Sequence, residues 1–139
     1  MVYAGVNYWA VVVAAAAGFA VGGVWYRLLA QPWMKAHGFT AKTMRKHHGK
    51  GAPPTPFIIA IVADLVMAWV LAGLIAHMGA VTLRSGVISA AFVWLGFVVT
   101  TLAVNNVFGL RSPRLILIDG GHWLVVLLLM GAIIGAWGV

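Results

Sequence analysis

Four long runs of apolar residues follow one another along the chain, and polar positions collect in the short segments between them. The runs cover about residues 7–29, 56–78, 83–108 and 113–137, and an α-helix needs ~20 apolar residues to cross a bilayer. A spanning backbone must be helical or form a closed barrel, and runs such as Val11–Ala17 lack the alternation of barrel strands. The pattern predicts an all-α, integral membrane four-helix bundle in which the whole chain forms one domain.

The composition agrees with a membrane protein. Hydrophobic residues make up 63% of the 139 positions, and charged residues make up 8%. A typical soluble domain has about 25% charged residues. The two acids, Asp64 and Asp119, are too few to help cover a water-facing surface, which excludes an ordinary soluble globule. The absence of cysteine excludes disulfides, thiolate metal sites and thiol catalysis.

The basic residues predict the orientation of the bundle. Eight of the nine Lys and Arg residues lie in or beside the segments 30–55 and 109–112, and the ninth is Arg84. These two segments fall on the same side of a four-helix bundle. Because positively charged loops stay in the cytoplasm, both termini are expected outside it.

Segment 30–55 is predicted to be a basic cytoplasmic loop. It contains Thr40 as the N-cap of a short helix over residues 41–48. A basic segment beside a membrane is usually explained by anionic lipid headgroups, so we expect no nucleic-acid partner. The histidines His37, His47 and His48 lack the spacing and neighbours of a metal site, and none is expected. The residues expected at the lipid headgroups are Lys35, Lys42, Arg45, Lys46 and Lys50.

Small residues predict how the helices pack. Helices in lipid associate where small residues let their backbones approach, and Ala14, Gly18 and Gly22 recur at intervals of four in the first span. Tyr26 continues this row, so its hydroxyl is expected to point into the bundle. Similar small residues in the third and fourth spans are Gly86, Ser89, Ala90, Gly131 and Gly135.

The polar residues within the spans are the candidate functional residues. An ionisable group at mid-bilayer costs about 2.5–3.5 kcal/mol unless it is paired or hydrated. Asp119 and His122 share one helix face, as do Thr101 and Asn105. All of them lie toward the side of the basic loops and are predicted to line one pocket open to the cytoplasm. The predicted pocket residues are Tyr26, Asp64, Thr101, Asn105, Asn106, Asp119 and His122, with Arg27, Arg111 and Arg114 at the rim.

A purely structural explanation of these residues is also open. Asp64 could accept hydrogen bonds from Asn105 or Asn106, and Asp119 could pair with an arginine, which would hold the helices in register without a ligand. A buried carboxylate beside a histidine could instead exchange a proton. The opposite half of the membrane offers only His77, so a pocket open on one side fits the residues better than a channel.

No enzyme motif is present, and we expect a protein without catalytic activity. The chain has no phosphate-binding glycine loop, no HExxH and no nucleophile elbow. A lone His122 gives little basis for a haem or pigment site, so no cofactor is expected. The first hypothesis is a homo-oligomer that binds or translocates a small solute or a proton. The alternative is an accessory or assembly subunit that docks by its helices to a larger membrane complex.

Several short motifs resemble one known family. They are Asn7–Trp9, the Gly-x-x-Trp-Tyr end of the first span at Gly22–Tyr26, Trp33–Lys35, Ile118–His122 and Leu129–Ile134. Together they cover nearly the whole chain and resemble the DUF1761 family of small bacterial membrane proteins. The resemblance implies a four-helix multi-pass protein of the bacterial inner membrane. The family has no established biochemical function, so the resemblance implies a fold and no mechanism.

Overall fold

A computed structural model describes residues 5–49, 51 and 53–138, without the side chains of His47 and His48. Every element in this described part of the chain is helical, which confirms the predicted fold class. The elements are α1 (Tyr8–Leu28), α2 (Ala30–His37), α3 (Ala41–His48), α4 (Thr55–His77), α5 (Leu83–Val93), the π-helical turn η1 (Trp94–Val98), α6 (Val99–Phe108) and α7 (Arg114–Trp137).

Four helices among the described residues are long and apolar enough to cross a membrane. They are α1, α4, the continuous stretch Leu83–Phe108 made of α5, η1 and α6, and α7. The chain is therefore a multi-pass membrane protein. Which side of the membrane the termini face stays a prediction.

Helix ends follow local side-chain chemistry. The side chain of Asn7 accepts hydrogen bonds from the first turn of α1, and Thr82 and Ser85 form a capping box at the start of α5. Thr40 caps α3 as predicted, by accepting from the backbone N–H of Thr43 at 3.1 Å. Gly38 ends α2 with φ +73°, a left-handed conformation that glycine adopts without a Cβ penalty. The basic loop therefore holds two short helices, where the sequence predicted only the second.

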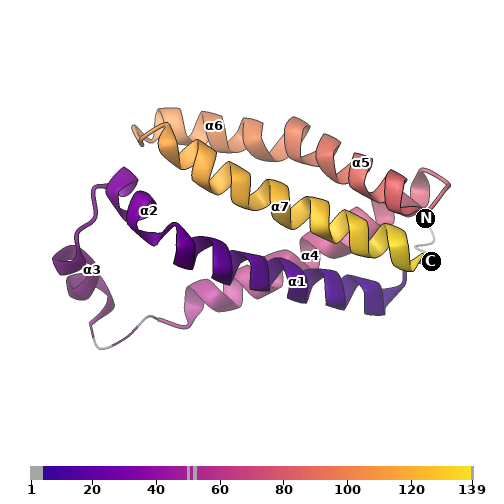
Figure 1. Ribbon diagram of the computed structural model, residues 1–139, viewed down its shortest axis with the longest axis horizontal. Coiled ribbons are helices and arrows are strands. Elements are labelled where there is room, and N and C mark those ends of the chain that lie inside the picture. The colour runs from indigo at the N-terminus through magenta and orange to yellow at the C-terminus, as the bar shows by residue number, and fades with distance from the viewer. Residues whose placement is uncertain (1–4, 50, 52, 139) are drawn as a thin grey trace.

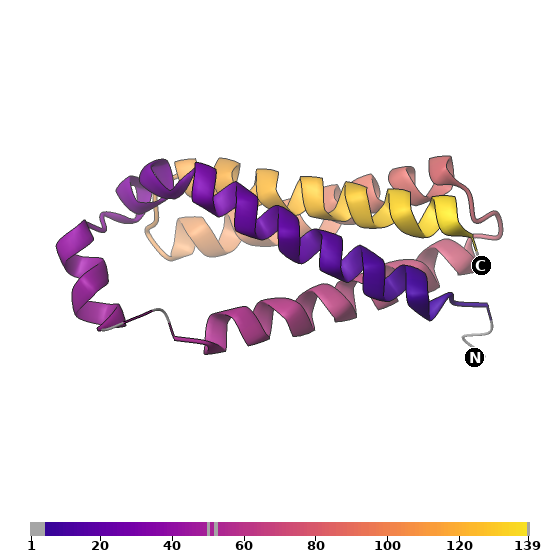
Figure 2. The ribbon, with the colours of Figure 1, turned by 60° about the horizontal axis from the view of Figure 1, so that its bottom comes forward.

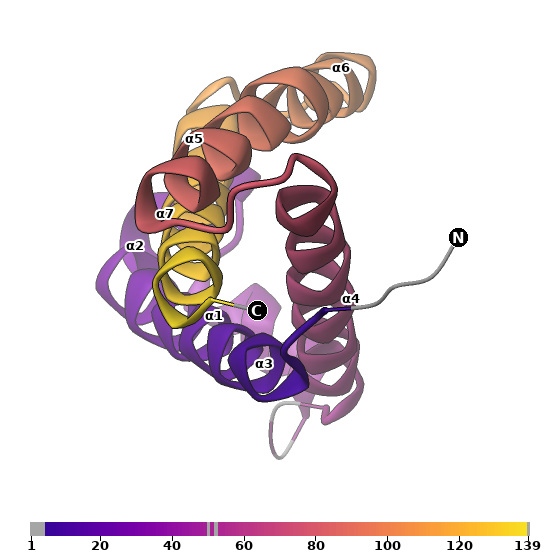
Figure 3. The ribbon, with the colours of Figure 1, turned by 90° about the vertical axis from the view of Figure 1, so that its right-hand side faces the viewer.

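Helix α7 lies at the centre of the arrangement. In Figure 1 it runs between α1 on one side and α5 and α6 on the other, and the end-on view of Figure 3 shows α4 on the far side of α1. The buried apolar side chains of these helices form one core that includes Ala14, Leu71, Val126 and Met130. All four predicted spans therefore contribute to a shared interior.

The tightest contact is the crossing of α5 and α7, made by small residues. A Cβ added to Gly86 would overlap the carbonyl oxygen of Gly131 and lie 3.2 Å from the Cα of Gly135. In α1, a Cβ on Gly18 would lie 2.7 Å from the terminal methyl of Met130. Small residues therefore lie at both contacts of α7, as predicted: backbone meets backbone at α5, and side chains of α7 pack on the glycines of α1.

Helices α1 and α4 are close in the middle of the bundle and separate toward one end. Figure 2 shows this divergence, with α2 and α3 linking the separated ends. We call this end of the bundle, where α1 ends and α4 begins, the loop end. The space between the diverging helices is the setting of the site described next.

Candidate functional site

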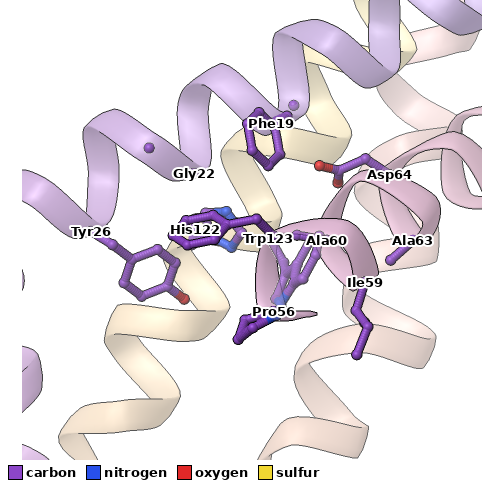
Figure 4. A pocket seen from close by; sticks show the side chains of 13 residues that line it. Phe19, Gly22, Tyr26, Pro56, Ile59, Ala60, Ala63, Asp64, His122 and Trp123 are labelled. Atoms are coloured by element: carbon purple, nitrogen blue, oxygen red, sulfur yellow. The ribbon is translucent and has the colours of Figure 1, made fainter. Parts of the chain in front are cut away.

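A cavity of about 520 Å³ opens between α1, α4 and α7 at the loop end, and we call it the inner cavity. Its walls are mainly apolar, and Figure 4 shows side chains reaching into it from all three helices. The sequence predicted its polar members but missed its apolar walls, because exposed and cavity-lining apolar residues look alike in a hydrophobic span. The lining residues are Gly18, Phe19, Gly22, Gly23, Tyr26, Pro56, Phe57, Ile59, Ala60, Ala63, Asp64, His122 and Trp123.

Asp64 is the buried acid of this cavity. Its side chain comes from α4 and is 4% exposed, and within the described part of the chain its Oδ1 has no hydrogen-bond partner. The side chain lies against Gly18, where an added Cβ would be 3.5 Å from Oδ1. A buried polar atom without a partner costs roughly 1–3 kcal/mol, and a charged one costs more. A hydrogen-bond donor placed beside Asp64 Oδ1 would therefore lower the cost of burying this acceptor.

His122 is the second polar group of the inner cavity. It projects from α7 and is 6% exposed, and its Nδ1 also lacks a hydrogen-bond partner among the described residues. Its ring centroid lies 4.9 Å from that of Tyr26 and 4.5 Å from that of Trp123. Gly22 makes room for the imidazole, because a Cβ there would lie 3.1 Å from Nε2. The small-residue row of α1 thus serves the site as well as the packing.

Asp119 lies on the other side of Tyr26, in a second pocket. The Tyr26 hydroxyl donates a 2.7 Å hydrogen bond to Oδ1 of Asp119, which joins α1 to α7. This pocket has a volume of about 420 Å³, and we call it the outer pocket. Tyr26 and Trp123 line both spaces, which adjoin at these two side chains. The residues that line the outer pocket are Tyr26, Trp33, His37, Leu102, Arg111, Asp119 and Trp123.

His37 lies at the end of α2, and the charged groups of the outer pocket influence the pKa of its imidazole. Partial burial lowers the pKa of its imidazole below the ordinary value, Asp119 opposes that shift, and Arg111 adds to it. Its ring contacts Trp33 at 4.3 Å and is stacked on Phe39 at 4.9 Å, centroid to centroid. The sequence did not point to His37 or Trp33 as pocket residues, since both lie in the loop rather than in a predicted span.

Two tryptophans fix the part of α7 that carries the site. The indole N–H of Trp25 donates to the carbonyl of Ile118 at 3.0 Å, and that of Trp94 donates to the carbonyl of Gly120 at 2.8 Å. Trp94 begins the π-helical turn η1, and such turns are frequent at functional sites. A Cβ on Gly121 would lie 3.0 Å from the Trp25 ring, so this glycine makes room for the indole.

Three predicted pocket residues lie elsewhere, which corrects the expectation of a single pocket. Thr101 and Asn105 are exposed on α6, and the Thr101 hydroxyl bonds the carbonyl of Phe97 in its own helix. Asn106 is buried but donates to the carbonyl of Ser112 at 2.9 Å, which closes the turn before α7. Sequence spacing could not show which way the faces of α6 turn.

The structure also contradicts the two contacts of the structural explanation. Neither asparagine is a hydrogen-bond partner of Asp64 Oδ1, and Asp119 bonds Tyr26 rather than an arginine. All three predicted rim arginines are exposed; Arg111 lines the outer pocket, whereas Arg27 and Arg114 line neither space. Asp64 does not meet the asparagines because α4 diverges from α7 toward the loop end. The Asp64 side chain faces α1 instead.

The predicted headgroup residues lie in or beside the two short helices. Lys35, Lys42, Arg45 and Lys46 are exposed, and Lys50 lies outside the described residues. Among the described residues, no group of three His, Cys, Asp or Glu side chains could hold a metal ion. The exposure leaves these cations able to meet headgroups, and that partner stays a prediction.

Comparison with known proteins identifies the family. A family model described as "Protein of unknown function (DUF1761)" matches residues 9–135, as the sequence motifs indicated. No curated protein and no solved structure matches the chain.

Proposed function

The chain belongs to the DUF1761 family of proteins of unknown function, and we propose that it binds a small amphipathic solute in the inner cavity. The observation that carries the proposal is a pair of unpartnered polar atoms at one apolar space. Oδ1 of Asp64 and Nδ1 of His122 both lack hydrogen-bond partners among the described residues, and both side chains line the cavity. A solute with a hydrogen-bond donor would satisfy the carboxylate and lower the cost of its burial.

The size and walls of the cavity define the solute further. Ligand sites commonly enclose 300–1,000 Å³, are mainly apolar and carry a few polar groups, and the 520 Å³ of the inner cavity fits this description. Phe19, Trp123 and the first turns of α4 supply the apolar surface. The solute therefore has an apolar body of modest size and at least one hydroxyl or amine group.

Binding accounts for these residues better than catalysis. A general base needs a partner that orients it and a nucleophile within hydrogen-bond reach. His122 Nδ1 has no such partner in the described part of the chain, and its neighbours are the rings of Tyr26 and Trp123. With the basic loops placed in the cytoplasm, the solute would enter from the cytoplasmic half of the bilayer.

The test compares two probes of nearly equal shape on the purified protein in detergent micelles. 2-Phenylethanol carries a hydroxyl, and ethylbenzene lacks it. Binding is measured by ligand-observed NMR, with empty micelles subtracted. We expect 2-phenylethanol to bind about tenfold more tightly, as one hydrogen bond to a buried polar group implies.

Two variants test whether the preference for 2-phenylethanol depends on Asp64 itself. Asp64→Leu should remove the preference for 2-phenylethanol, because no acceptor is left at that position. Thr101→Val is the matched control: it removes an exposed hydroxyl that lines neither cavity, and it should bind both probes as the wild type does. Equal binding of the two probes to the wild type, or an unchanged preference in Asp64→Leu, would contradict the proposal.

A further inference from the structure

The outer pocket is a second candidate binding site, distinct from the inner cavity in its charges. The inner cavity holds one acid and no basic group other than His122, whereas the outer pocket holds Asp119, Arg111 and His37. The two spaces share only Tyr26 and Trp123 among their lining residues, so the charged groups of the outer pocket belong to it alone.

Asp119 offers an oriented carboxylate to this pocket. The 2.7 Å hydrogen bond from Tyr26 fixes Oδ1 and leaves Oδ2 with no hydrogen bond to a described residue. No described residue forms an ion pair with Asp119. A half-buried carboxylate without a counter-ion is a favourable site for a cation, because charge-assisted hydrogen bonds are about twice as strong as neutral ones.

Aromatic side chains surround the same space. Tyr26 and Trp33 meet edge to face with ring centroids 6.3 Å apart, and Trp123 lines the pocket from α7. Aromatic faces attract ammonium groups, and clusters of them beside a carboxylate are a recognised way to bind alkylammonium ligands. The negative group and the rings together favour an ammonium group in this part of the pocket.

Arg111 adds the opposite charge. It lines the same pocket as Asp119, yet the two side chains form no ion pair in the described structure. A guanidinium presents a planar set of donors that matches phosphate and carboxylate oxygens. Two opposite charges that face one pocket without neutralising each other are complementary to a ligand that carries both.

We propose that the outer pocket binds a zwitterion, with its ammonium group at Asp119 among the rings of Tyr26, Trp33 and Trp123 and its anionic group at Arg111. The chemistry required is an amine linked by a few bonds to a phosphate or carboxylate. The headgroup of an ethanolamine phospholipid and a soluble zwitterion both supply it. The proposal rests on the outer pocket alone and does not require a solute in the inner cavity.

The test uses O-phosphoethanolamine and its two halves, ethylamine and ethyl phosphate, on the protein in phosphatidylglycerol nanodiscs. Affinities are measured by isothermal titration calorimetry against empty nanodiscs. We expect the zwitterion to bind at least tenfold more tightly than either half. Asp119→Asn and Arg111→Gln should each remove that advantage, since each deletes the partner of one charged group.

Two further variants serve as controls. Arg114→Gln removes an exposed arginine that lines neither space and should leave the zwitterion affinity unchanged. Asp64→Leu alters only the inner cavity and should also leave it unchanged, so the failure of one proposal is distinguishable from the failure of the other. Circular dichroism checks that every variant is folded.

The proposal is wrong if no zwitterion binding is measured, if a half-molecule binds as tightly as the zwitterion, or if Arg114→Gln lowers affinity as much as Arg111→Gln does. A second set of nanodiscs, containing phosphatidylethanolamine, identifies the source. Loss of the O-phosphoethanolamine signal there supports a lipid headgroup as the occupant, and an unchanged signal supports a soluble zwitterion.

Discussion

The crossing of α5 and α7 gives the sharpest prediction about stability. In Gly86→Ala, the new Cβ would overlap the carbonyl oxygen of Gly131 and lie 2.9 Å from its carbonyl carbon. The obstructing atoms are backbone, so no side-chain rotation relieves the contact and the two helices must separate. Overpacking a core costs roughly 1–3 kcal/mol, and a rigid neighbour places this case at the upper end. Alanine recovers up to about 1 kcal/mol of helix propensity, so the expected net loss is about 2 kcal/mol.

The measurement is unfolding in mixed micelles with a rising fraction of sodium dodecyl sulfate, followed by circular dichroism. A loss of 2 kcal/mol lowers the folded-to-unfolded ratio about thirtyfold. Gly96→Ala is the matched control in the same span, because a Cβ there meets no atom within 4 Å, and it should stay within about 0.5 kcal/mol of wild type. If Gly86→Ala unfolds together with this control, the close crossing of α5 and α7 is incorrect.

Two predictions concern the outer pocket. In NMR titrations, the pKa of His37 should lie below 6.5 because partial burial disfavours its charged form; Asp119→Asn should lower it further, and Arg111→Gln should raise it. The folded protein holds this proton less tightly than the unfolded chain does, so protonation of His37 should lower the stability of the fold as the pH falls below about 6.5. Shifts of the His37 pKa in the opposite directions in the two variants would contradict this electrostatic arrangement. Tyr26→Phe deletes the hydroxyl that bonds Asp119 and should cost about 1–2 kcal/mol in the same unfolding assay, whereas an unchanged midpoint would mean that the bond does not join α1 to α7.

Long apolar runs and small-residue spacing were sufficient to predict the bundle. Each span is long enough to be recognised by composition, and the row Ala14, Gly18 and Gly22 identifies the face of α1 that packs on α7. These features depend on interactions within one helix or on the close approach of two backbones. The spans are visible in the sequence as long apolar runs. Close approach is visible because only glycine and other small residues permit such contacts.

The site was predicted only in part, because helix rotation and divergence are tertiary properties. Tyr26, Asp64 and His122 line one cavity, as predicted. Tyr26 continues the small-residue row of α1, and Asp64 and His122 were recognised as ionisable groups within apolar spans. Thr101 and Asn105 were predicted in the same pocket but are exposed on α6. The π-helical turn η1 lies between them and the packed half of the third span, and it shifts the face that follows in a way that a 3.6-residue period does not anticipate.

The two acids of the chain, which the sequence predicted to line one pocket, differ in what they contact. Asp119 accepts a hydrogen bond from another helix, so it contributes to the register of α1 and α7. Asp64 Oδ1 has no hydrogen-bond partner among the described residues, so no hydrogen bond through this atom joins α4 to another described helix. A buried polar group of this kind lowers stability, and a well-packed apolar side chain in its place often raises it.

Asp64→Leu should therefore be more stable than wild type by about 1–3 kcal/mol in the micelle assay. The inner cavity beside residue 64 gives the larger side chain room. Asp64→Asn is the control, because it keeps the shape and the polarity of the side chain and should gain less. A leucine variant that gains stability while losing its preference for 2-phenylethanol would show a residue kept for binding at the expense of the fold. A variant that loses stability would instead reveal a structural partner for Asp64, and both the unpartnered carboxylate and the solute site built on it would be wrong.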